Sequence, residues 1–174
     1  MYDFIDISSL TGKQLFSTKD WTDFGSPETF AKMPDHHKLQ ILFLDKKSTN
    51  AVYSAFNQRD LLCGDDGWGN TPFSAGCFHS VETYFVKDKH TAELKKWLYH
   101  RALRFSEPVL FLRPFCGIDT PAILTTWKLT IKYADELFRG DNLIVVSPSA
   151  NWCLYYHHDG LISFAKQANR TILW

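Results

Sequence analysis

The last third of the chain constrains the fold most, because apolar segments follow one another there with turn residues between them. Asn142–Ser147 and Trp152–His157 have the length and composition of strands, and Asp159-Gly160 leads into a third apolar segment over 161–165. Asp and Gly both tolerate the positive φ angles of a type I′ turn. We therefore expect a tight hairpin that pairs strands 152–157 and 161–165 antiparallel.

A helix is expected ahead of these strands, opened at Asp119-Thr120-Pro121 and closed at Gly140. Its apolar residues recur three or four positions apart, as Leu124, Trp127, Ile131, Ala134 and Phe138. Polar residues lie away from that stripe, namely Lys128, Lys132, Asp135 and Glu136. Gly140 is expected to take the left-handed conformation that commonly ends a helix. One face of the helix should therefore pack on a sheet.

Shorter patterns predict further elements in the first two thirds of the chain. Strands are expected over 3–7, 39–44, 81–86 and 109–112, with a buried helix as an alternative for 39–44. Helices are expected from Ser26-Pro27-Glu28 to Pro34, from a cap at Ser48-Thr49-Asn50, and from Asp88 or Thr91 through Leu94, Trp97, Leu98 and Ala102. The sequence thus predicts one α+β domain over 1–174, with amphipathic helices on a mostly antiparallel sheet and a C-terminal β-hairpin.

The charge balance and the lengths of the apolar runs argue against several classes of function. Nineteen basic and nineteen acidic residues leave no net charge, which argues against a broad nucleic-acid-binding surface. The longest apolar runs are far shorter than the roughly 20 residues of a membrane span, so no membrane partner is expected. Cys63, Cys77, Cys116 and Cys153 are widely spaced, and the chain starts without the basic and apolar regions of a secretory signal. A reduced, cytoplasmic protein is expected.

A glycine-rich segment between Cys63 and Ser80 predicts a long surface loop. Within it, Asp65, Asp66 and Trp68 are the candidate partner-binding residues, because few apolar neighbours are available to bury that tryptophan. The segment lacks the spacing of a calcium or phosphate loop, and Cys77-x-His79 has no second ligand pair at zinc-site spacing. No cofactor and no metal are therefore expected.

Two groups of residues suggest chemistry. Cys116 precedes the expected helix start and could act as a nucleophile with His157 or His158 and Asp119, with Arg113 lowering the pKa of its thiol. The alternative is that Cys116 is simply a small apolar residue. His157-His158-Asp159 could supply metal ligands or a general base. Successive strand residues point to opposite faces, however, so the two histidines should diverge unless the turn begins at His158.

The C-terminal pattern resembles bacterial immunity proteins that neutralise polymorphic toxins. The residues that carry the resemblance are the Trp-bearing helix over 121–139, Asp141-x-Leu-x-Val, Trp152-x-Leu-x-x-His157 and Asp159-Gly-x-x-x-Phe164. The resemblance implies a non-enzymatic protein that binds one toxin domain stoichiometrically. It names no binding residues. The runner-up is a cysteine-dependent hydrolase or transferase built on Cys116, and a structural module is third.

Overall fold

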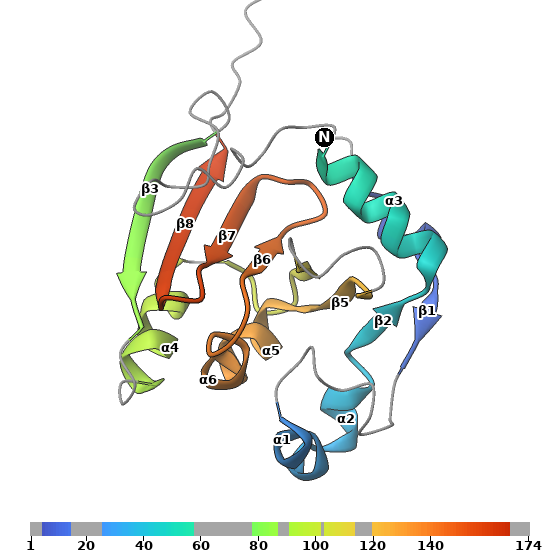
Figure 1. The fold of residues 1–174 in the computed structure, drawn as a ribbon, viewed down its shortest axis with the longest axis horizontal. Coiled ribbons are helices and arrows are strands. Elements are labelled where there is room, and N and C mark those ends of the chain that lie inside the picture. Colours follow the sequence, from blue (N-terminus) through green and yellow to red (C-terminus); the bar gives the residue numbers. More distant parts are fainter. Residues whose placement is uncertain are drawn as a thin grey trace, which may run out of the picture.

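The computed structural model describes residues 5–14, 26–57, 78–86, 91–101, 103–113 and 120–167. They form an α+β fold around a single eight-stranded sheet in which every neighbouring pair of strands is antiparallel (Figure 1). The strand order is β1-β2-β5-β4-β6-β7-β8-β3. The expected fold class is confirmed, including the C-terminal hairpin.

The strands are β1 Gly12–Lys13, β2 Leu42–Leu44, β3 Phe78–Phe85, β4 Pro108–Leu112, β5 Ile123–Thr126, β6 Leu143–Val146, β7 Trp152–Tyr156 and β8 Leu161–Gln167. The α-helices are α1 Pro27–Lys32, α2 Asp35–Lys38, α3 Lys46–Asn57, α4 Thr91–Tyr99, α5 Trp127–Lys132 and α6 Ala134–Leu137, and a 3-10 helix covers Ile7–Ser9. No helix in these described ranges is long and apolar enough to cross a bilayer.

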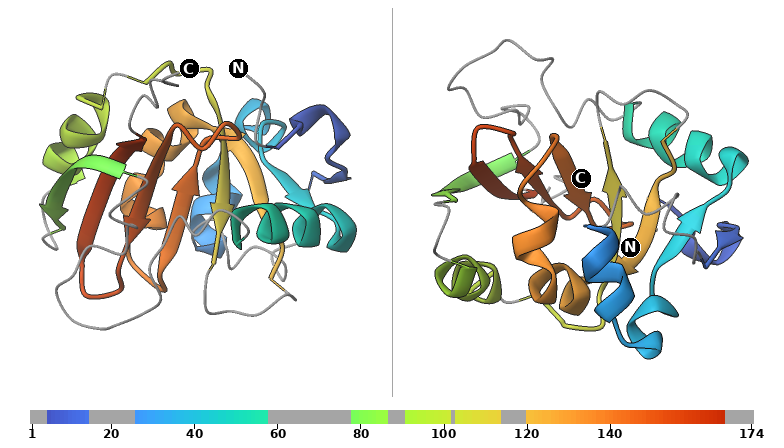
Figure 2. Two further views of the ribbon diagram at one scale, coloured as in Figure 1. Left: turned by 90° about the horizontal axis from the view of Figure 1, so that it is seen from above. Right: turned by 60° about the horizontal axis from the view of Figure 1, so that its bottom comes forward.

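The sheet is buried on both faces. Alternate residues of β4, β6 and β7 enter two separate apolar clusters, as successive side chains of a strand must. α1, α4, α5 and α6 pack on one face through residues such as Phe30, Leu98, Trp127 and Leu137. α3 packs on the opposite face through Val52 and Phe56 (Figure 2).

The prediction of a helix from Pro121 to Arg139 is wrong for the residues before Trp127. Residues 123–126 form β5, which pairs with β4 and β2 in the interior of the sheet. Ile123 and Leu124 join opposite apolar clusters, as strand alternation requires. The helix begins only at Trp127, where the Thr126 hydroxyl accepts a hydrogen bond from the Leu129 amide at 3.4 Å. Tertiary pairing of β-branched residues overrides the helical spacing here.

The end of that helical region also differs from expectation. The helix breaks at Tyr133 and resumes as α6, which ends at Leu137. Gly140 does not have a positive φ, so it supplies no left-handed cap. The last turn is closed instead by the Phe138 amide, which donates to the Ala134 carbonyl at 3.0 Å.

The C-terminal hairpin pairs β7 with β8 as expected, but its turn is not type I′. The Gly160 amide donates to the His157 carbonyl at 2.9 Å, and the His157 amide donates to the Leu161 carbonyl at 2.8 Å. Only Gly160 in this turn has a positive φ, of 92°. His158, Asp159 and Gly160 therefore form a three-residue loop, a β-turn followed by a left-handed glycine. This geometry places both histidines beside Asp159.

Several shorter predictions can be compared directly. α1 starts as expected, with the Ser26 hydroxyl accepting a hydrogen bond from the Thr29 amide at 3.1 Å. The strand expected over 39–44 is confirmed only as β2, over 42–44. Of the strand expected over 3–7, the described part is a bend that runs into the 3-10 helix at Ile7.

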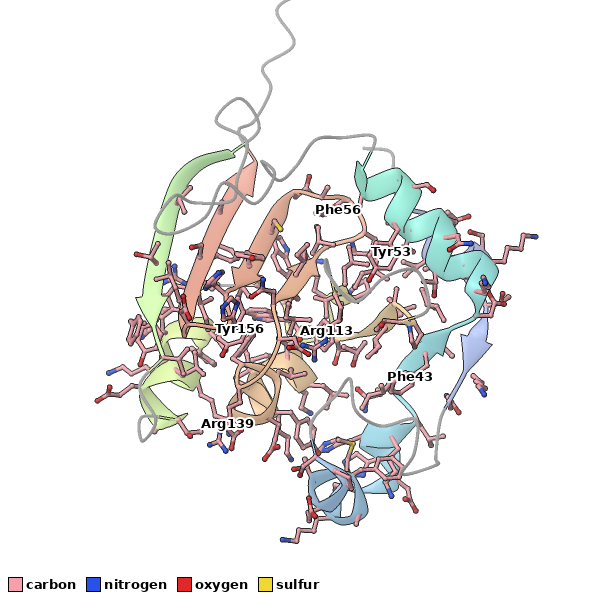
Figure 3. The ribbon with its side chains drawn as sticks, in the orientation of Figure 1. Phe43, Tyr53, Phe56, Arg113, Arg139 and Tyr156 are labelled. Carbon is pink, nitrogen blue, oxygen red and sulfur yellow. The ribbon has the colours of Figure 1, made fainter. Side chains whose placement is uncertain are left out.

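The cap expected at Ser48-Thr49-Asn50 is wrong, because α3 already begins at Lys46. The Asp45 carboxylate accepts a hydrogen bond from the Ser48 amide at 2.8 Å and so caps the helix. α3 is also tied to the end of β4 by Tyr53, whose hydroxyl accepts a hydrogen bond from the Arg113 amide at 2.9 Å (Figure 3).

Candidate functional site

A pocket of about 550 Å³ lies at one end of the sheet, where the β7–β8 hairpin, the end of β3, α4 and α6 meet. Its apolar lining comes from Phe85, Val86, Leu94, Phe138 and Tyr156. Its polar lining includes Asp135, Arg139, His158 and Asp159. Tyr156 at the end of β7 and Arg139 just after α6 are labelled in Figure 3. Polar and apolar groups contribute about equally to the lining, and binding pockets combine apolar contact with polar groups that orient a bound molecule.

The apolar part of the pocket is built by pairing and packing. Phe85 lies opposite Leu161 in the β3–β8 register, and the Val86 amide donates to the Gly160 carbonyl at 2.7 Å. Phe138 packs on Tyr156 with ring centroids 5.5 Å apart. Phe85 nevertheless remains 57% exposed, which is high for a large apolar side chain. The pocket thus has a packed floor and an exposed aromatic residue at its rim.

Charges of both signs surround the opening. Asp135 on α6 pairs with Lys95 on α4 through Nζ and Oδ1 at 3.1 Å, and this ion pair links the two helices that form the helical wall. Arg139 and Asp159 are exposed and add one charge of each sign. The pocket therefore has no strong net charge that would select an anion or a cation by electrostatics alone.

The hairpin loop brings His157, His158 and Asp159 together. The two rings lie with centroids 4.1 Å apart, and one donor atom from each of the three residues lies within 4.8 Å of the others. The two rings do not diverge, because the strand ends at Tyr156 and the turn begins at His158, which is the exception that the sequence-based expectation allowed. Asn142, a buried residue ahead of β6, anchors the loop through hydrogen bonds to His158.

The cysteine that the structure describes, Cys153, is not a candidate nucleophile. It lies in β7 inside the apolar cluster on the α3 face, and it is fully buried. Burial strongly raises the pKa of its thiol, so it stays protonated at neutral pH. Cys153 is best understood as a small core residue.

The other predicted site residues fall outside the described ranges. These are the partner-binding candidates Asp65, Asp66 and Trp68 and the cysteine-centred pair Cys116 and Asp119. The exposed-tryptophan prediction and the hydrolase alternative both stay predictions.

Sequence reasoning missed most of the pocket. Phe85 lies in an expected strand and Asp135 lies on the polar face of an expected helix, and neither position indicates a pocket. Arg139 and Asn142 belong to no motif that indicates a binding site. The reason is topological: β3 lies beside β8 at the sheet edge although the two strands are far apart in sequence. His158 and Asp159 are the site residues that the sequence did single out.

No protein-family model, characterised protein or solved structure matches this chain significantly. Its function therefore has to be inferred from its own residues.

Proposed function

We propose that this protein is a non-enzymatic binding module that neutralises a bacterial toxin domain by forming a stoichiometric complex with it. The toxin class is proposed from the resemblance of the C-terminal sequence pattern to immunity proteins. The pocket at the hairpin end of the sheet is the proposed docking site. The observation that carries the docking site is the exposure of Phe85 at the rim of a pocket with an apolar floor.

The chemistry of the pocket suits an amphipathic side chain from a protein partner. The floor formed by Leu94, Phe138 and Tyr156 offers apolar contact to the stem of such a side chain. Arg139 and Asp159 at the opening offer a charge of each sign to its polar end. Protein interfaces concentrate their binding energy in aromatic and arginine residues that fill such pockets.

The rigidity of the site also supports a binding role. Three contacts tie the walls together: the Lys95–Asp135 ion pair, the Phe138–Tyr156 ring contact and the backbone hydrogen bond between Val86 and Gly160. A preformed pocket loses little side-chain entropy when a partner binds. A neutral chain has no long-range charge steering, so affinity has to come from shape and aromatic contact.

A growth-protection assay tests the proposal. If a large secreted protein is encoded beside this gene, cells express its C-terminal domain together with this chain or a variant. We expect the wild-type chain to restore growth and Phe85→Ser to lose most of that protection. Tyr99→Ser is the matched control, because Tyr99 is 59% exposed on α4 but does not line the pocket.

The same assay separates binding from catalysis. A binding protein should protect equally well with Cys116→Ser, whereas a cysteine-dependent enzyme would lose its nucleophile. Loss of protection in Cys116→Ser with an unchanged melting temperature would refute the binding proposal. Failure of the wild-type chain to protect against this domain would reject the toxin assignment.

A further inference from the structure

The hydrogen bonds of the hairpin loop fix which nitrogen of His158 carries a lone pair. The Asn142 side-chain oxygen lies 2.8 Å from the His158 backbone nitrogen and 3.0 Å from its Nδ1. A backbone N–H can only donate, so the Asn142 atom that faces it must be the acceptor oxygen. That oxygen then requires Nδ1 to carry the hydrogen. In the neutral ring, the lone pair of His158 is therefore on Nε2.

The neighbouring backbone fixes the other ring in the same way. The Asp159 amide donates to His157 Nδ1 at 3.3 Å. This nitrogen must offer a lone pair, so the hydrogen of the neutral His157 ring is on Nε2. The two rings thus have opposite tautomers, each set by a group outside the ring itself.

Both of these nitrogens lie near the same carboxylate. His157 Nδ1 lies 3.4 Å from Asp159 Oδ2, and His158 Nε2 lies 3.5 Å from Asp159 Oδ1. Nitrogen lone pairs facing carboxylate oxygens repel one another unless a positive charge lies between them. A charge-assisted hydrogen bond would bring these atoms to about 2.7–2.9 Å, so the observed spacing is long for direct contact.

We infer that the hairpin loop binds a Zn²⁺ ion through His157 Nδ1, His158 Nε2 and a carboxylate oxygen of Asp159. Zinc would take the lone pair that His157 Nδ1 otherwise offers to the exposed Asp159 amide in a long hydrogen bond of 3.3 Å. Tetrahedral zinc with ligands 2.0–2.1 Å away holds its donor atoms about 3.3 Å apart. Each nitrogen is already close to that distance from one oxygen of Asp159, His157 Nδ1 from Oδ2 and His158 Nε2 from Oδ1. One ligand atom from each of the three residues lies within 4.8 Å of the others, so rotation of these side chains has only a short distance to close.

The surroundings suit an accessible zinc site. Imidazole and carboxylate are ordinary zinc ligands, and three protein ligands leave a position for water or for a group of a bound molecule. Asn142 is a buried group that orients a ligating ring through its other nitrogen, which is the usual support for a zinc histidine. The site lies at the rim of the pocket, because His158 and Asp159 also line it. It does not depend on the proposed toxin partner.

Calorimetric titration of the untagged full chain with zinc chloride tests the site. His158→Gln and Asp159→Asn each remove one ligand from an exposed loop, and His100→Gln removes an exposed histidine elsewhere as the control. Every variant keeps all four cysteines and the remaining histidines, so zinc binding by those residues cancels in the comparison.

We expect the wild type and His100→Gln to bind one equivalent of Zn²⁺ that His158→Gln and Asp159→Asn bind at least tenfold more weakly. Asn142→Ala should weaken the same equivalent about tenfold or more, because a supporting hydrogen bond typically contributes that much to metal affinity. Equal zinc stoichiometry and affinity in the wild type, His158→Gln and Asp159→Asn would overturn the inference.

Discussion

At the scale of single residues, aromatic and polar side chains connect the helices to the sheet on the face that α1, α4, α5 and α6 cover. Trp127 at the start of α5 is completely buried and meets Trp152 of β7 edge to face, with ring centroids 5.3 Å apart. His37 on α2 is also buried, and its Nδ1 lies 2.7 Å from the Tyr133 hydroxyl between α5 and α6. These two residues give separate tests of the packing.

Trp127→Ala should reduce the free energy of unfolding by about 3–5 kcal/mol, because truncation leaves a large cavity between α5 and β7. Urea unfolding followed by circular dichroism measures this loss. Tyr99→Ala is the control, since its ring is exposed and the variant should stay within about 0.5 kcal/mol of the wild type. Equal stability of the two variants would show that Trp127 is not a core residue.

His37 should make the protein less stable in mild acid. Burial, and then the nearby charges of Lys132, His36 and Lys128, lower the pKa of His37 below its ordinary value. The unfolded chain therefore takes up a proton at a higher pH than the folded chain does. Stability should fall as the pH drops below about 6.5 and stop falling once the pH is below the folded-state pKa.

Melting temperatures measured between pH 7.5 and pH 4.5 test whether stability falls with pH as predicted. His37→Gln should flatten the profile in that range, whereas His36→Gln, which alters an exposed neighbour on the same helix, should largely keep it. A profile that is as steep in His37→Gln as in the wild type would assign the acid sensitivity to other groups.

At the scale of elements, the sequence predicts a strand or helix well where one local signal dominates. Ser26-Pro27 fixed the start of α1, and Asp159-Gly160 fixed the position of the hairpin. The segment 121–126 was misassigned, because Leu124 and Trp127 have the three-residue spacing that fits a helix, while Ile123–Thr126 also suits a buried strand. Pairing with β2 and β4 decided the outcome, and no local pattern reports such pairing.

The turn type of the hairpin could not be predicted from the sequence, and substitutions at two glycines test the observed turn. Gly160 has a φ of 92°, and a Cβ there would lie 3.1 Å from the Val86 carbonyl oxygen. Gly160→Ala should therefore cost about 1–2 kcal/mol of stability through left-handed strain. Gly140→Ala meets no atom within 4 Å and has no positive φ, so it should be neutral or slightly stabilising. Equal losses in both variants would contradict the described hairpin.

At the scale of the whole molecule, the candidate site depends on the order of the strands. β3 comes early in the chain but pairs with β8, the last described strand, and this pairing places Phe85 beside the His158–Asp159 loop. The sequence could identify the loop because its residues are adjacent and chemically distinctive. It could not identify Phe85, Asp135 and Arg139 as neighbours, because their proximity arises only after the sheet edge and α6 have assembled.

The central claim is that this pocket binds a protein partner, and calorimetric titration with the purified toxin domain that this chain protects against in the growth assay measures that most directly. We predict a 1:1 complex in which Phe85→Ser weakens binding about thirtyfold, the equivalent of about 2 kcal/mol for a hot-spot residue. Tyr99→Ser should bind like the wild type. A Phe85→Ser variant that is folded and binds with wild-type affinity would contradict the claim.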